Sequence, residues 1–275
     1  MLLGRMASAH PLSHLWRLTR IAAFLVLVPL PALAGCGGPA KCNAGDTACL
    51  RILFVGNSYT FANDLPGTLA ALAQSGSHKV ETDSLASGGA TLADHVADAA
   101  TAARLDAEKW NFVVLQEQSQ IPSVQASRQY TMYPAARTLA GEIRQRQETP
   151  LFFMTWAHRD GWPEDGMPDY VSMQSAIQSG YMAIAGELHA GVAPVGHTWS
   201  TVRQQSPGIG LWQDDGSHPS IAGTYLAACV FYAAIFRTSP AGLGYTDGLP
   251  SGTAQTLQKA AGVDVLSNAG QWGLQ

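Results

Sequence analysis

From Arg51 onward, short apolar runs alternate with longer segments of helical composition. Each run is short enough to be a buried strand, and the intervening segments are rich in Ala, Leu, Gln and Glu, which favour helix. The predicted strands cover residues 51–56, 79–83, 111–115, 151–155 and 191–195, and the predicted helices cover residues 66–75, 92–105, 128–147, 170–188 and 219–236. This alternation predicts a single α/β domain with a parallel sheet.

The first 35 residues have the pattern of a targeting segment and not of the fold. Residues 1–20 carry three arginines and no acidic residue, and an apolar stretch follows over residues 21–34. This order is typical of a signal peptide. Two prolines interrupt the apolar stretch, which is shorter than the roughly 20 residues that a transmembrane helix needs. A permanent span is therefore the weaker interpretation.

The segment Leu33-Ala34-Gly35-Cys36 resembles a bacterial lipobox. The resemblance implies cleavage before Cys36 and a lipid anchor on that cysteine, so that the membrane becomes a partner. Because Gly37 is not the aspartate of inner-membrane retention, the resemblance favours the periplasmic side of the outer membrane. The alternative is an ordinary secretory signal with a chance cysteine. We therefore predict a signal peptide over 1–35, a tether over 36–49 and the folded domain over 50–275.

Composition narrows the class of protein. Hydrophobic residues make up 47% and charged residues 13% of the 275-residue chain, which is ample apolar material for one core. The formal net charge is −4, and the body of the chain contains no run of Lys or Arg. A nucleic-acid partner is not expected, because binding to phosphates needs a basic patch.

The cysteines fit an exported protein. Cys42 and Cys49 are close enough in sequence to close a small disulfide in an oxidising compartment, although proximity alone does not prove the bond. Cys229 lies in an apolar stretch and is expected to pack in the core. No CxxC or HExxH motif occurs, so no structural zinc or zincin site is predicted.

Two polar motifs stand where chemistry is expected in such a fold. Ligands of open α/β sheets bind at the carboxyl ends of the strands. Ser58 follows the first predicted strand, and Asp215-Gly-Ser-His218 precedes the last long helix. An imidazole activates a serine when a carboxylate holds its other nitrogen, and an aspartate three residues away can do so. Separately, Ser58 could be a turn residue and Asp215 a helix cap.

Together these motifs are similar to the successive blocks of SGNH/GDSL hydrolases. The four blocks occur in order as Gly56-Asn57-Ser58, Ser87-Gly88-Gly89-Ala90-Thr91, Gln116-Glu117-Gln118-Ser119 and Asp215-Gly216-Ser217-His218. The resemblance implies a flavodoxin-like, three-layer α/β/α sandwich with a mainly parallel five-stranded sheet. It also implies that Ser58 is the nucleophile, His218 the base and Asp215 its orienting partner, without any cofactor or metal.

By the same resemblance, the oxyanion donors are the Ser58 amide, the Gly89 amide and the Gln118 side chain. The chain departs from the family pattern in two places. Asn57 replaces the usual Asp before the serine, and Gln118 replaces the usual Asn of the third block, which adds a methylene and a rotor. Gln116 has the same strand parity as Gln118 and could take its place. The Gln-Glu-Gln-Ser form resembles a less studied branch of the superfamily.

Four further residues are candidates for lining the substrate pocket: Asn57, His95, Gln116 and Trp156. For His95, capping or partial exposure is an equally good interpretation. Trp156, together with His158 and Trp162, follows the fourth strand and could form a wall against a sugar ring or acyl group, or simply pack in the core.

The sequence thus predicts a serine hydrolase that cleaves an acyl or acetyl ester. The ester would be carried by a small molecule, a glycan or another component of the cell envelope. A lipoprotein that binds carbohydrate or a protein partner without catalysis is one alternative, and it would need neither Ser58 nor His218. A metal-dependent phosphoesterase using Asp215, His218 and His197 is another.

Overall fold

The computed structural model describes residues 41–43 and 45–274. The predicted signal peptide over residues 1–35 and the lipid attachment at Cys36 lie outside the described residues, so both stay predictions. Within the described ranges, no helix is both long enough and apolar enough to cross a membrane.

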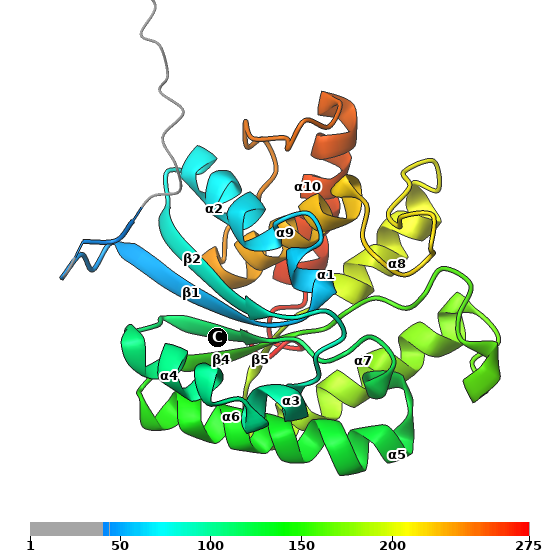
Figure 1. Ribbon diagram of the computed structural model, residues 1–275. Coiled ribbons are helices and arrows are strands. Elements are labelled where there is room, and N and C mark those ends of the chain that lie inside the picture. The colour runs from blue at the N-terminus through cyan, green and yellow to red at the C-terminus, as the bar shows by residue number, and fades with distance from the viewer. Residues whose placement is uncertain (1–40, 44, 275) are drawn as a thin grey trace, which may run out of the picture. The chain divides into compact units, whose positions relative to one another are not determined.

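A five-stranded parallel sheet forms the centre of the fold (Figure 1). Its strands are β1 (Cys49–Gly56), β2 (Lys79–Ala86), β3 (Phe112–Leu115), β4 (Thr149–Phe153) and β5 (Gly191–Ala193). The spatial order is β2-β1-β3-β4-β5, and every neighbouring pair is parallel. The predicted α/β fold is confirmed, and all carboxyl ends of the strands lie at one edge.

Helices cover both faces of the sheet and complete a three-layer sandwich (Figure 1). On one face lie α2 (Leu65–Ser75), α8 (Val195–Gln205), α9 (Ile221–Phe236) and α10 (Ser251–Leu266). On the other lie α3 (Leu92–Ala97), α4 (Ala99–Ala107), α5 (Gln125–Ser127), α6 (Tyr133–Gln145) and α7 (Tyr170–Leu188). The remaining elements are α1 (Ser58–Phe61), a π-helical turn η2 (Arg128–Met132) and two 3₁₀ turns, η1 (Ile121–Ser123) and η3 (Pro163–Asp165).

Caps explain where several helices differ from the sequence prediction. The helix predicted over 92–105 is divided between α3 and α4, because the Asp98 side chain accepts from the Ala100 amide and starts a new helix. The last helix of the site region begins at Ile221 and not at Pro219. Ser220 caps it by accepting from the Gly223 amide. Two helices, α8 and α10, were not predicted.

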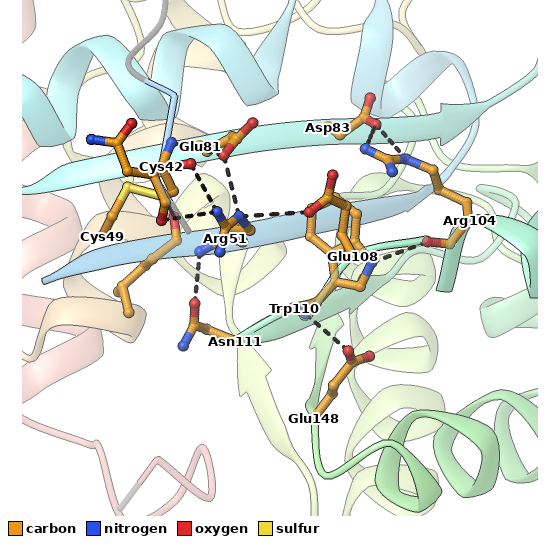
Figure 2. Close-up of polar contacts among 12 residues, drawn as sticks. Cys42, Cys49, Arg51, Glu81, Asp83, Arg104, Glu108, Trp110, Asn111 and Glu148 are labelled. Atoms are coloured by element: carbon orange, nitrogen blue, oxygen red, sulfur yellow. Dashed lines mark hydrogen bonds and ion pairs between the residues drawn. A yellow bond between two sulfur atoms is a disulfide. The ribbon is translucent and has the colours of Figure 1, made fainter. Parts of the chain in front are cut away.

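The segment before β1 is fastened to the amino edge of the sheet (Figure 2). Cys42 and Cys49 form a disulfide with a Cα–Cα distance of 5.6 Å. The Arg51 guanidinium donates to the Cys42 carbonyl at 2.8 Å, and the Glu81 carboxylate accepts from the Cys42 amide at 2.9 Å and from Arg51 Nε at 3.3 Å. The disulfide that the sequence left open is therefore present, and its loop lies at the sheet edge opposite the carboxyl ends of the strands.

Removing this disulfide should lower the free energy of unfolding by about 2 kcal/mol, the loop-closure entropy expected for so short a ring. The measurement is urea unfolding of the wild type with and without reductant, compared with the Cys42→Ala/Cys49→Ala double variant. The unfolding midpoint of the variant should match that of the reduced wild type and should not change with reductant, since Cys229 is buried and unpaired. Equal midpoints for the oxidised and reduced wild type would contradict this expectation.

Candidate active site

Ser58 stands directly beyond the carboxyl end of β1, at the start of α1. Asn57 shapes this turn, because its Oδ1 accepts from the Tyr59 amide at 3.1 Å and its Nδ2 donates to the Ala90 carbonyl at 3.0 Å. Gly56 is required here: a Cβ at this position would lie 2.4 Å from Gln116 Oε1. The turn therefore holds the Ser58 hydroxyl at the sheet edge while its neighbours are buried.

Gln116 supports this turn from below. Its Oε1 accepts from the Asn57 amide and from Thr60 Oγ1, both at 2.9 Å, while its Nε2 donates to Asn57 Oδ1 at 2.9 Å and to the Glu117 carbonyl at 2.8 Å. The side chain is completely buried. Both ends of its amide are thus occupied, and Gln116 does not line the cavity or offer a free donor there, contrary to the expectation that it could replace Gln118.

His218 bridges Ser58 and Asp215. Its Nε2 lies 2.9 Å from Ser58 Oγ, and its Nδ1 lies 2.5 Å from Asp215 Oδ2. The second carboxylate oxygen, Oδ1, accepts from the Ser217 and His218 amides at 2.9 Å each. The turn passes through Gly216 with φ +69°, a conformation that favours glycine. The fold thus brings Ser58 together with Asp215, which lies 157 positions later in the sequence, and with His218, three positions after Asp215.

The electrostatics of Asp215 suit the role of an acceptor. Burial would raise the pKa of this carboxyl, but the hydrogen bonds from His218 and from the Ser217 and His218 amides outweigh it and lower the pKa to about 2. Asp215 is therefore a carboxylate at neutral pH and accepts a hydrogen bond from His218 Nδ1, which carries the proton. This tautomer leaves the Nε2 lone pair facing the Ser58 hydroxyl.

Aromatic rings brace the histidine from behind. The Tyr59 ring meets the His218 ring edge to face at 5.7 Å, and its Oη lies 2.6 Å from Ser217 Oγ. Trp156 stacks on Tyr59 at 4.5 Å and donates its Nε1 to the Ser217 carbonyl at 2.9 Å. Trp156 is completely buried and positions the turn before His218. It does not line the cavity, contrary to the prediction that it is a lining residue.

A cavity of about 480 Å³ opens above Ser58 and His218. Its wall is formed by Asn57, Ser58, Tyr59, Gly88, Gly89, Gln118, Ser119, Gln120, His158, Ser217 and His218. Three larger cavities, about 670 Å³ beside α2, about 760 Å³ near β5 and about 530 Å³ beside the end of α4, contain neither Ser58 nor His218. The chemistry therefore identifies the smaller cavity as the candidate site.

The second and third motif blocks form one side of this cavity. Gly89 is exposed and has φ +72°. Gln118 reaches the same wall, and its Oε1 accepts from the Gln120 amide at 2.8 Å and from the Ile121 amide at 3.3 Å. Because two backbone donors hold the oxygen, the amide orientation is fixed. Its Nε2 donates to Ser119 Oγ and to Gln120 Oε1 at 3.3 Å each, and it serves an oxyanion by exchanging one of these two long contacts. This restraint removes much of the freedom that the extra methylene of glutamine adds.

Two histidines have different places. His158, from the loop after β4, lines the cavity with its Nε2 3.4 Å from Ser119 Oγ, and burial lowers the pKa of its imidazole so that it is neutral at pH 7. His95 is buried behind the site, where its Nε2 lies 2.8 Å from the Gly56 carbonyl, and it is not part of the wall. Ser119 and Gln120 were not singled out from the sequence as lining residues, although Ser119 is the last residue of the third block and Gln120 directly follows it.

The metal-site alternative needs His197 beside Asp215 and His218. The His197 ring instead packs against Trp272, 5.0 Å between centroids, next to the strand β5. Throughout residues 41–43 and 45–274, no group of three or more His, Cys, Asp or Glu side chains could hold a metal ion. The ligand set of that alternative is not assembled.

A parallel α/β sheet with a serine, histidine and aspartate at the carboxyl ends of its strands has the architecture of a serine hydrolase. No protein-family model and no curated protein matches the chain. Solved structures do: a protein from Slackia heliotrinireducens assigned as an SGNH hydrolase is 32% identical, with a TM-score of 0.58 over 66% of this chain and 97% of that one. The chain therefore belongs to the SGNH hydrolases, which confirms the resemblance of the four blocks.

Two more distant structures share the fold. A DUF4886 family protein from Bacteroides uniformis is 19% identical, with a TM-score of 0.69 over 79% of this chain and 95% of that one. A variant of Axe2, an acetyl xylan esterase from Geobacillus stearothermophilus, is 17% identical, with a TM-score of 0.51 over 66% and 93%. The first of these matches covers the larger share of the chain, so the fold extends over most of the described residues.

Proposed function

We propose that this protein hydrolyses carboxylic esters with Ser58 as nucleophile, His218 as base and Asp215 as the group that orients it. The observation that supports this proposal best is the placement of the His218 ring. One of its nitrogens lies 2.9 Å from Ser58 Oγ and the other 2.5 Å from Asp215. A histidine that merely caps a helix or faces solvent has no need of both partners.

In the proposed reaction, Ser58 Oγ attacks the ester carbonyl carbon while its proton passes to His218 Nε2. The negative charge on the carbonyl oxygen is stabilised by the Ser58 and Gly89 amides and by Gln118 Nε2. His218 then gives its proton to the departing alcohol oxygen, which leaves an acyl group on Ser58. Water attacks that group with His218 again as base, and the carboxylic acid and free Ser58 are regenerated. None of these steps needs a metal or an organic cofactor.

The lining of the cavity favours a short acyl group on a hydroxyl-rich alcohol. Beyond the reacting groups, Ser119, Gln120 and the neutral His158 present donors and acceptors to the cavity. Side chains of this kind suit sugar hydroxyls better than a long alkyl chain. Acetylated glycans are therefore the proposed substrate class, in line with the name of the acetyl xylan esterase that shares the fold.

The proposal is tested by reaction with a serine-directed fluorophosphonate and mapping of the adduct by peptide mass spectrometry. A single adduct on Ser58, lost in His218→Ala, together with release of acetate from acetylated oligosaccharides, is the expected result. A folded protein that is neither labelled nor active on any acetyl ester would favour the binding lipoprotein instead.

Gln118→Ala should lower kcat for an acetyl ester by about 10²-fold while KM changes by only a few-fold, because the lost donor acts mainly on the developing oxyanion. Steady-state kinetics with p-nitrophenyl acetate separates the two constants. Gln118→Asn, which restores the residue usual in the family, should keep more activity than alanine. A kcat equal to that of the wild type in Gln118→Ala would remove this side chain from the oxyanion hole.

A further inference from the structure

Glu117 stands between two residues of the site without belonging to its wall. It follows Gln116 beyond the end of β3 and is completely buried. Its Oε1 accepts from the Leu92 amide at 3.1 Å and from the Gln118 amide at 2.7 Å. Leu92 is the first residue of α3 and directly follows the second motif block, whereas Gln118 belongs to the third. One oxygen atom therefore joins the two blocks that supply Gly89 and Gln118.

The contact is not needed to cap α3. Thr91 already caps that helix, because its side chain accepts from the Asp94 amide while the Asp94 carboxylate accepts from the Thr91 amide. Nor does the contact offset the free-energy cost of burying the Glu117 carboxyl. Glu117 Oε2 is buried without a hydrogen-bond partner in the described part of the chain, and burial raises the pKa of this group to about 7. The ionised form therefore costs stability, which calls for another reason to place a carboxyl here.

We propose that Glu117 is a positioning residue of the oxyanion hole, whose Oε1 holds the Gly89 loop and Gln118 in the relative placement that stabilises the oxyanion. The inference rests on the proposed esterase function. The backbone of Glu117 is also held in place, because its amide donates to Tyr181 Oη of α7 at 3.1 Å. The hydrogen bonds from the Leu92 and Gln118 amides should be stronger to a carboxylate than to a neutral acceptor, because charge-assisted hydrogen bonds are about twice as strong.

Glu117 is the group near this junction that titrates in the useful pH range. Asp94 of α3 faces it, but hydrogen bonds from the Thr91 backbone and side chain lower the pKa of Asp94, which stays anionic. Burial raises the pKa of Tyr181, which stays neutral. Of these three groups, only Glu117 therefore changes its charge between about pH 5.5 and pH 8.5. Any pH dependence that is common to both proteins cancels when they are compared at each pH.

The experiment compares kcat of the wild type and Glu117→Gln for p-nitrophenyl acetate across this range. The glutamine keeps an acceptor oxygen but never becomes a carboxylate. The wild-type to variant ratio should be close to one at about pH 5.5 and rise to about 3-fold or more at about pH 8.5, with KM nearly unchanged. The wild type should also lose stability relative to the variant, measured by Tm, mainly between about pH 4.5 and pH 7, because over that range the carboxyl is ionised in the unfolded chain and still protonated in the folded one. Up to about pH 7, activity and stability should thus move in opposite directions.

Glu148 provides a matched control. It is also buried, its Oε1 accepts from the Trp110 amide at 2.9 Å, and its Oε2 has no partner among the described residues (Figure 2). Burial also raises the pKa of Glu148, but this residue precedes β4 at the opposite edge of the sheet. Glu148→Gln should therefore leave kcat equal to that of the wild type at every pH, whatever it does to stability.

A second variant, Glu117→Met, removes the acceptor while keeping the volume, and should lower kcat by about 10-fold or more even at low pH. If this variant does not fold, the Glu117→Gln ratio still decides. A flat ratio, or one that falls with pH, overturns the positioning role while wild-type activity and its loss in Ser58→Ala leave the esterase proposal standing. A wild type without any ester activity overturns both.

Discussion

Replacing Ser58 with alanine should lower kcat for an acetyl ester by about 10⁴-fold or more, because no covalent intermediate can then form. The substitution deletes one oxygen atom at a partly buried position, so Tm should stay close to that of the wild type. Steady-state kinetics on p-nitrophenyl acetate and a thermal melt check both expectations. Fluorophosphonate labelling should disappear in the same variant.

The matched measurement is the Ser58→Ala/His218→Ala double variant. Residues that act as a unit are strongly non-additive, so the double variant should be about as slow as either single one. Two other serines, Ser119 and Ser217, line the same cavity and are the natural rivals for the nucleophile. More than about a tenth of wild-type kcat in Ser58→Ala would shift the assignment to one of them.

The positions of the strands along the chain and the sheet edge that holds the site were predictable because both depend on local patterns. Apolar runs such as residues 51–56 are too short for buried helices, and the polar residues after them must gather at one sheet edge when the strands are parallel. Ser58 and His218 could be paired only through the resemblance, since nothing in a single sequence gives the distance between residues 160 positions apart.

The roles of the two third-block glutamines were not predictable from strand parity. Side chains alternate between faces only inside a strand, and β3 ends at Leu115. Beyond that point the backbone turns, so Gln116 points into the Asn57 turn while Gln118 reaches the cavity. Trp156 was similarly ambiguous, because the sequence does not show that its ring has a partner in Tyr59.

The two unpredicted helices were missed for a different reason. The buried positions of α10 include Ala254, Leu257, Ala261 and Val265, which is a helical period, but glycines and threonine among them weaken the propensity. In α8, Gly196 is needed for packing, since a Cβ there would lie 2.0 Å from the Thr155 carbonyl oxygen. Tertiary contacts outweigh local preference in both helices.

Replacing Asp215 with asparagine should lower kcat by about 10³- to 10⁴-fold while leaving the fold intact. The Asn oxygen can keep the place of Oδ1, which accepts from the Ser217 and His218 amides. Its NH₂ group then faces His218 Nδ1 and favours the tautomer with the proton on Nε2, which cannot accept one from Ser58. The expected loss is therefore of the base and not of the site.

The pH dependence of the two proteins separates this role from a purely structural one. Because hydrogen bonds outweigh burial and lower the pKa of Asp215 to about 2, its stabilising effect is complete above the ordinary aspartate value of about 4 and is lost only as the pH falls through about 2. The wild type and Asp215→Asn should therefore differ in kcat by a similar factor from about pH 6 to 9. Asp214, the exposed neighbouring carboxylate, is the control, and Asp214→Asn should be as active as the wild type. Equal losses in both variants would mean that charge near His218, and not the hydrogen bond to Nδ1, supports the reaction.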